Sequence, residues 1–111
     1  SVNVLAQEAG IVAIKNKSHL IKSKSIIKKE YNFLKNKISN MQGFECNDSS
    51  TNFILIKIKQ DSTKLQKKLL KKKILIRDCK NFRGLNNHYI RVAIKSHKDN
   101  LKLVNALRAT I

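Results

Sequence analysis

The chain has 111 residues, of which 41% are hydrophobic. This length allows one domain with a modest core but not two, and the hydrophobic content excludes a chain that is disordered throughout. No apolar run approaches the ~18 residues that a membrane span needs, and the first residues lack the basic region of a signal peptide. The two cysteines lie far apart with no CxxC pair, which indicates neither a zinc site nor a disulfide framework. We therefore expect a reduced, cytoplasmic setting.

The formal net charge of +17 raises the hypothesis of a basic nucleic-acid-binding module. Two features of the composition weigh against it. The 24 cationic side chains comprise 20 lysines and 4 arginines, and the lysines are spread over every predicted helix. Aromatic residues make up only 5% of the chain, too few for a base-stacking surface. We interpret most lysines as solvated, keep the nucleic-acid-binding module as an alternative function, and expect non-specific binding to polyanions at low salt.

Two helices are predicted in the first 40 residues. Ser1 suits an N-cap, and apolar residues at helical spacing predict a helix over 2–16, with Gly10 as a weak point. A long helix is predicted over 18–40, because an apolar stripe recurs there at steps of three, four and seven residues. The stripe comprises Leu20, Ile27, Tyr31, Leu34, Ile38 and Met41.

The rest of the chain alternates strands and helices. A short strand is predicted over 44–46 and a second over 52–59, and a helix that opens at the capping types Asp61 and Ser62 runs to about residue 72. Further strands are predicted over 74–76 and 89–95. The last helix begins at Ser96, where Asp99 three residues later resembles a capping box. The strand residues predicted to face the core are Ile54, Ile56, Ile58, Ile90, Val92 and Ile94, and the helix residues are Leu65, Leu69, Leu70, Leu101, Val104, Leu107 and Ile111.

This order, two helices followed by ββαββα, predicts an α+β fold. We expect a small, mostly antiparallel sheet with helices packed on one face, because alternating strands and amphipathic helices each need one covered side. The sequence has no internal repeat, no proline and no low-complexity linker. We therefore expect residues 1–111 to form a single domain, in which 1–40 is a helical joint and 41–111 carries the sheet.

Three of the four arginines fall within the segment 74–95, ILIRDCKNFRGLNNHYIRVAIK. Strand alternation places Arg91 on the face opposite the aliphatic row of its strand. Arg77 follows the preceding predicted strand, so the two arginines stand at facing ends of neighbouring strands. A guanidinium group binds carboxylate or phosphate through a planar fork, which lysine lacks. Two such arginines, Arg77 and Arg91, are suited to hold a doubly anionic small molecule. In the alternative, Arg77 pairs with Asp78 or another nearby carboxylate and Arg91 is a surface strand residue. Spacing alone favours this alternative slightly, because ion pairs are common and specific anion sites are rarer.

No other side chains form a recognisable catalytic or metal-binding pattern. His19, His88 and His97 have no ligand spacing with each other or with cysteine, and we interpret them as loop and surface residues. Cys79 has no adjacent base that would make it a nucleophile, so a packed thiol is favoured. Gly84 belongs to neither a GxGxxG nor a Walker motif and more simply supplies a turn with positive φ. No residue is therefore assigned as catalytic, cofactor-binding or metal-binding.

Four pieces of the sequence carry a family resemblance and together cover nearly the whole chain. They are SVNVLAQEAGIVAI at 1–14, STNFILIKI at 50–58, KKKILIRDCKNFRGL at 71–85 and HYIRVAIKSHKDNLKLVNAL at 88–107. In this order and near this spacing they resemble the C-terminal part of pyridoxal-phosphate enzymes related to histidinol-phosphate aminotransferase. RDC-NF-GL followed by YIRVA is the most specific part, and it is most similar to the branch called threonine-phosphate decarboxylase.

The resemblance implies the small C-terminal domain of a fold-type I enzyme that acts with pyridoxal 5'-phosphate on an amino-acid phosphate. By similarity, Arg91 matches the arginine that binds the substrate's α-carboxylate, and Arg77 matches one that contacts the substrate or its phosphate. The family's cofactor lysine, the aspartate of the pyridine nitrogen and the phosphate cup lie upstream of a segment like 1–3. We therefore expect an excised or truncated part that binds no cofactor alone.

Two reactions share these arginines. The RDC-NF-GL wording favours an L-threonine-O-3-phosphate decarboxylase of cobalamin biosynthesis, and the alternative is a histidinol-phosphate aminotransferase of histidine biosynthesis. The whole enzyme is expected to be a cytoplasmic homodimer. A patch of apolar surface is expected around Val4, Ile11 and Val12, where the missing large domain would pack.

Overall fold

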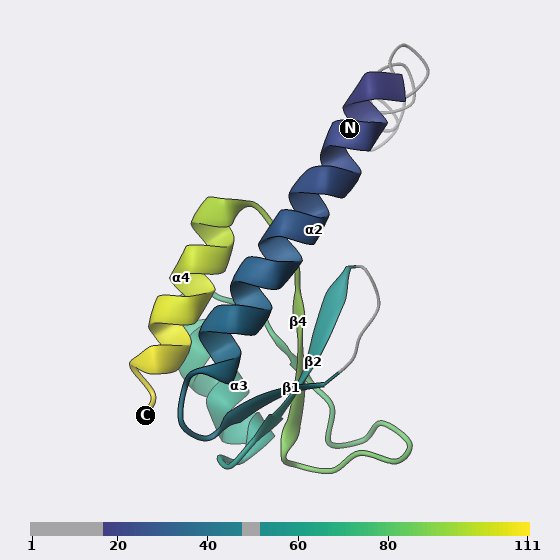
Figure 1. The fold of residues 1–111 in the computed structure, drawn as a ribbon. Helices are drawn as coiled ribbons and strands as arrows, with labels where there is room; N and C mark the ends of the chain where they lie inside the picture. Colours follow the sequence, from purple (N-terminus) through teal and green to yellow (C-terminus); the bar gives the residue numbers. More distant parts are fainter. Residues whose placement is uncertain (1–16, 48–51) are drawn as a thin grey trace, which may run out of the picture.

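The computed structural model describes residues 17–47 and 52–111 as helices, strands and connecting loops (Figure 1). The predicted helix over 2–16 and the expected apolar patch around Val4, Ile11 and Val12 lie outside the described residues. The long helix predicted over 18–40 is confirmed. The elements are α2 (Lys17–Ser39), β1 (Phe44–Asn47), β2 (Phe53–Ile58), α3 (Ser62–Lys71), β3 (Arg77–Asp78), β4 (Tyr89–Ala93) and α4 (His97–Arg108).

The four strands form one antiparallel sheet in the order β1-β2-β4-β3. The two central strands are adjacent although α3, β3 and a loop separate them in sequence. Ile56 lies opposite Ile90 and Leu55 lies opposite Arg91 in the register between β2 and β4. The sheet and the helices confirm the predicted α+β class.

All three described helices contribute to one core on one face of the sheet, and α2 and α4 run side by side above it (Figure 1). This face carries the aliphatic row that strand alternation predicted, with Ile54, Ile56 and Ile90 fully buried. The opposite face has no helix among the described elements. The helix residues of the core are Leu34, Ile38, Leu65, Leu69, Leu103, Val104, Ala106 and Leu107.

The strand predicted over 74–76 is wrong, because only Arg77 and Asp78 pair with β4. The backbone of 74–76 is instead bonded to helix α3: the Ile74 N–H donates to the Leu69 carbonyl at 3.0 Å, and the Ile76 carbonyl accepts from Gln66 Nε2 at 3.2 Å. With these groups engaged by the helix, the segment makes no ladder with β4. The hydrogen bonds to α3 therefore outweigh the preference of these aliphatic residues for a strand.

Three apolar residues predicted to face the core are exposed instead: Leu70 by 54%, Leu101 by 42% and Ile111 by 63%. Leu70 follows Leu69 by about 100° around the helix, which turns it off the buried stripe. The inward stripe of α4 begins with a polar residue, Asn100, which occupies the place that apolar periodicity assigned to Leu101. Ile111 lies beyond the end of the helix.

Both predicted helix caps are present. Asp61 accepts from the Lys64 N–H at 3.0 Å, and Ser96 Oγ accepts from the Asp99 N–H at 3.3 Å. Each bond satisfies an N–H that the first turn of a helix leaves without an intrahelical partner. The sequence signals for the starts of α3 and α4 are therefore confirmed.

A buried polar cluster joins α2 to α4, and sequence periodicity did not indicate it. Glu30 is only 4% exposed, and its carboxylate accepts from Asn100 Nδ2 at 3.0 Å and lies 3.1 Å from His97 Nδ1. The Asn100 side chain also bonds the backbone of Lys95, accepting from its N–H at 3.0 Å and donating to its carbonyl at 2.9 Å. One amide thus joins the long helix, the end of β4 and the start of α4.

The end of α3 places a lysine where glycine is preferred. Lys73 has φ +62°, the left-handed conformation at the first residue beyond a helix end. We expect Lys73→Gly to raise the free energy of unfolding by about 0.5–1 kcal/mol, because glycine adopts this conformation without a Cβ penalty. Urea unfolding of the two chains measures the difference. Lys72→Gly is the matched control, since φ −93° suits any residue; it should lower stability, and a gain there would contradict the argument.

The polar cluster gives a second stability prediction. We expect Asn100→Ala to lower the free energy of unfolding by about 2–3 kcal/mol, because it removes one hydrogen-bond donor from the buried Glu30 carboxylate and leaves both backbone groups of Lys95 without their partner. Asn105→Ala, at an exposed position of the same helix, should change stability by no more than about 0.5 kcal/mol. Equal effects of the two substitutions in thermal or urea unfolding would show that the cluster contributes nothing specific.

Candidate anion-binding site

The structure brings the two predicted arginines together on the open face of the sheet. Arg77 of β3 and Arg91 of β4 are direct Cα partners in the antiparallel ladder. Directly opposed residues in a ladder project to the same side. That side is opposite the core, because Ile90 and Val92, which flank Arg91, are both buried. The two guanidinium groups therefore share one face, as the sequence pattern predicted.

Two phenyl rings lie against these guanidinium groups. Arg91 Cζ is 4.3 Å from the centroid of Phe53, on the neighbouring strand β2. Phe82, in the loop between β3 and β4, contacts both arginines: its ring centroid is 5.5 Å from Arg77 Cζ and 5.7 Å from Arg91 Cζ. These distances fall within the range of cation–π contact. The sequence analysis assigned no role to either ring. For Phe82, its place in the RDC-NF-GL motif was the one feature of the sequence that pointed to it.

Neither guanidinium group forms an ion pair with a carboxylate among residues 17–47 and 52–111. The alternative in which Arg77 pairs with Asp78 is wrong, because Asp78 belongs to the helix-covered side of the sheet. Its carboxylate accepts from Ser62 Oγ and Thr63 Oγ1, each at 2.6 Å. In the same described part of the chain, Arg91 Nε is buried and has no hydrogen-bond partner. Within the part of the chain that the structure describes, the N–H donors of the two arginines are thus left without a carboxylate partner.

The Asp78 carboxylate anchors the loop that carries Phe82. Burial would raise the pKa of Asp78, but hydrogen bonds from Ser62, Thr63 and the Lys80 N–H outweigh it and lower the pKa below its usual value. The carboxylate therefore stays ionised and bonded at neutral pH. Gly84, with φ +79°, supplies the positive-φ turn predicted for this loop.

Cys79 follows β3 directly and is fully buried, with its Sγ 3.7 Å from the carbonyl oxygen of Arg77. Burial raises the pKa of its thiol, and the nearby positive charge of Arg91 opposes this only in part. A buried, protonated thiol is a poor nucleophile. This confirms the packed thiol favoured from the sequence.

Two of the three histidines have structural contacts. His88 Nδ1 lies 3.1 Å from each of the carbonyl oxygens of Ile58 and Gln60, and His97 contacts the buried Glu30. His19 belongs to the part of α2 whose side chains are not described. The contacts of His88 and His97 are thus with groups other than the two arginines.

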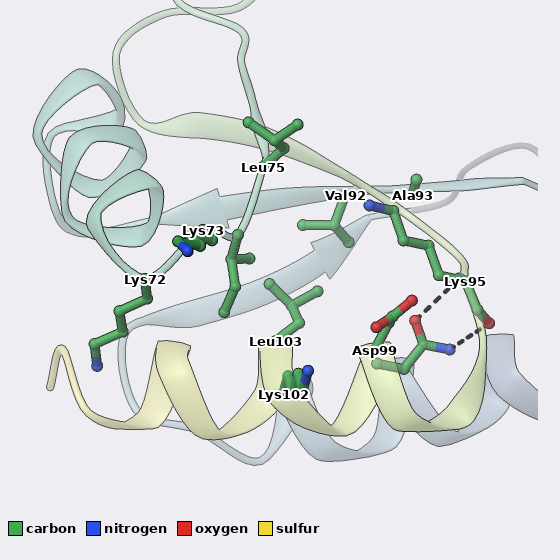
Figure 2. A pocket seen from close by; sticks show the side chains of 11 residues that line it. Lys72, Lys73, Leu75, Val92, Ala93, Lys95, Asp99, Lys102 and Leu103 are labelled. Carbon is green, nitrogen blue, oxygen red and sulfur yellow. Dashed lines mark hydrogen bonds between the residues drawn. The ribbon is translucent and has the colours of Figure 1, made fainter.

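A hollow of about 320 Å³ lies elsewhere, between α4 and the segment that joins α3 to β3 (Figure 2). Its lining includes four lysines, of which Lys95 and Lys102 come from the β4–α4 end of the chain, and a single carboxylate, Asp99. Lysine side chains at its rim extend into solvent, as most lysines of this chain do. We place the candidate site at the arginine pair instead, because planar forks and an unbonded buried donor indicate specific anion recognition.

No known protein-family model matches the chain. Individual proteins do. The chain is 32% identical over 108 residues to threonine-phosphate decarboxylase from Salmonella typhimurium, which covers 97% of this chain and 30% of that protein. It is 33% identical over 107 residues to histidinol-phosphate aminotransferase from Methanosarcina mazei, with 96% and 28% covered. The chain thus spans less than a third of the length of these relatives.

A solved structure has the same fold. The histidinol-phosphate aminotransferase from Clostridium acetobutylicum superposes with a TM-score of 0.81 and 32% identity, covering 86% of this chain and 29% of that one. Sequence and structure therefore agree with the resemblance carried by the arginine motif. The chain is therefore homologous to the C-terminal portion of the threonine-phosphate decarboxylases and histidinol-phosphate aminotransferases, which are fold-type I pyridoxal-phosphate enzymes.

Proposed function

We propose that this chain is the substrate-binding C-terminal part of a pyridoxal-phosphate-dependent L-threonine-O-3-phosphate decarboxylase. Arg91 holds the α-carboxylate of the substrate and Arg77 holds its phosphate. The observation that carries the proposal is the cross-strand pair Arg77–Arg91, which has no carboxylate partner among the described residues. The RDC-NF-GL and YIRVA motifs support the same assignment.

The electrostatics of the pair favour a ligand with two anionic groups. Like charges directly opposite each other in a ladder destabilise a sheet. A carboxylate on Arg91 and a phosphate on Arg77 would offset this repulsion and fill the donors left free. The open face of the sheet leaves room for such a ligand, since no described helix covers it.

The described residues at this site fit the substrate and not the cofactor. The arginine face offers guanidinium groups and phenyl rings, but no carboxylate that could pair with a pyridine nitrogen accompanies them in the described chain. In the whole enzyme, pyridoxal phosphate supplies the electron sink. The contribution of this portion is to hold the substrate's anionic groups in a fixed orientation. A cytoplasmic homodimer and docking of this portion on a large domain are parts of the same proposal.

A histidinol-phosphate aminotransferase is the second candidate, and the superposition on the Clostridium acetobutylicum enzyme is the observation that favours it. The two reactions are distinguished by the full-length protein incubated with each substrate. Release of CO₂ from O-phospho-L-threonine supports the decarboxylase. Transfer of the amino group of histidinol phosphate to a 2-oxo acid, without CO₂ release, supports the aminotransferase.

The distribution of lysines counts against the nucleic-acid-binding alternative. Every lysine whose side chain is described is exposed, and these lysines occur on all three described helices, on β2 and in loops. A specific binding surface concentrates its cations on one face. The affinity for a DNA duplex should therefore be weak, independent of sequence and steeply reduced by salt.

The proposal predicts distinct effects of arginine substitutions in the full-length enzyme. Arg91→Ala and Arg77→Ala should each lower kcat/KM for O-phospho-L-threonine by a factor equivalent to about 2–4 kcal/mol, because each removes the charged partner of one anionic group of the substrate. Steady-state decarboxylation measures the change.

Arg83→Ala is the matched control for these variants. Arg83 lies in the same loop as Phe82, is exposed and has no described partner among residues 17–47 and 52–111. Its replacement should change kcat/KM by less than about twofold. A wild-type kcat/KM in Arg91→Ala would reject the carboxylate role, and the same result in Arg77→Ala would reject the phosphate role.

A further inference from the structure

Phe82 is the one residue of the β3–β4 loop whose ring contacts both guanidinium groups. Resting on the function proposed above, we propose that Phe82 is a positioning residue that holds Arg77 and Arg91 in register for a substrate with two anionic groups. Phe53 contacts Arg91 and not Arg77, and it restrains Arg91 in the same way. This assigns a specificity role to a side chain that has no group able to bind the substrate's oxyanions.

The geometry explains why a ring suits this role better than a carboxylate. A carboxylate between the arginines would occupy two or more of their N–H donors and cancel their charge. The face of a phenyl ring attracts a guanidinium group through its quadrupole and leaves the donors at the edge of the group available. Phe82 therefore restrains both side chains while keeping them able to bind anions.

The loop is built to hold the ring in place. The Cys79 N–H donates to the Tyr89 carbonyl at 3.1 Å, the Phe82 N–H donates to the Cys79 carbonyl at 3.0 Å, and the Leu85 N–H donates to the Phe82 carbonyl at 3.0 Å. These bonds attach the loop to β4 and fold it into consecutive turns on each side of Phe82. The ring itself is half-buried.

The different reach of the two rings gives a test that separates positioning from general stability. Phe82 contacts both arginines, whereas Phe53 contacts the proposed carboxylate-binding Arg91. Two ligands of the full-length holoenzyme, used as probes, distinguish the two contacts. O-phospho-L-threonine carries both anionic groups, and L-threonine carries only the carboxylate. The readouts are KM for the first, the inhibition constant for the second, and their ratio.

We expect Phe82→Leu to raise KM for O-phospho-L-threonine about tenfold and the inhibition constant of L-threonine about threefold, since each lost cation–π contact is worth a factor of about three. The preference for the phosphorylated probe should thus fall about threefold. Phe53→Leu should weaken both probes about threefold and leave the preference unchanged. In both variants kcat should stay within about twofold, because restrained binding acts on KM.

Three further variants complete the experiment. Phe82→Tyr retains the ring face and should restore wild-type values, and Phe82→Met replaces Phe82→Leu should the latter not fold. Phe33→Leu removes a ring that stacks at 4.6 Å on His97, away from the arginines, and should leave both constants unchanged. A loss of overall stability alone would not alter the preference between the two probes.

The inference is overturned when Phe82→Leu or Phe82→Met keeps the wild-type preference while Arg77→Ala abolishes it. In that case the arginines bind the substrate without help from the ring, and the proposed function stands. When Arg77→Ala itself keeps the wild-type preference, the phosphate role proposed for Arg77 fails and the inference fails with it. A reduced preference in the ringless variants, restored by tyrosine, supports the positioning role.

Discussion

The pairing of β2 with β4 is the constraint on which the rest of the structure depends. These are the two central strands, and their register places Ile56 against Ile90 and Leu55 against Arg91. Because side chains in a strand alternate between faces, burying Ile90 and Val92 beneath the helices forces Arg91 to the other side. A slip of one residue would bury the arginine and expose the isoleucines. Burial of the aliphatic side chains on one face of the sheet thus determines that Arg91 lies on the other face.

The same pairing explains how a distant residue reaches the site. Phe53 begins β2, and its position opposite Ala93 brings its ring beside Arg91. Arg77 reaches the same point from the other edge, through the two-residue strand β3. The three side chains come from three strands, and a sheet with this order is what places them together. The short β3 suffices because Asp78, bonded to Ser62 and Thr63, attaches it to the start of α3.

Much of this arrangement could be read from the sequence, and the parts that could not have physical causes. Alternation identified the buried row of β2 and β4 and the outward Arg91, because period-two patterns in strands are simple consequences of the pleat. Capping residues identified the starts of α3 and α4. The segment 74–76 was misread because its aliphatic residues favour strands, while the hydrogen bonds that hold it come from Gln66 and the end of α3. Glu30 was missed because its partners His97 and Asn100 lie far along the chain. Phe82 was missed because its contacts with Arg77 and Arg91 depend on the conformation of an irregular loop, which periodicity does not describe.

The link between α2 and β4 has a mechanical consequence. Glu30 is bonded to Asn100, and Asn100 holds both backbone groups of Lys95, just beyond the strand that carries Arg91. A tilt of α2 must either break these bonds or carry β4 along. The long helix projects beyond the sheet at its N-terminal end (Figure 1), and these bonds couple its tilt to the end of the strand that carries Arg91. A force applied to that projecting end would load the hydrogen bonds of Glu30 and Asn100 and, through Lys95, the end of β4.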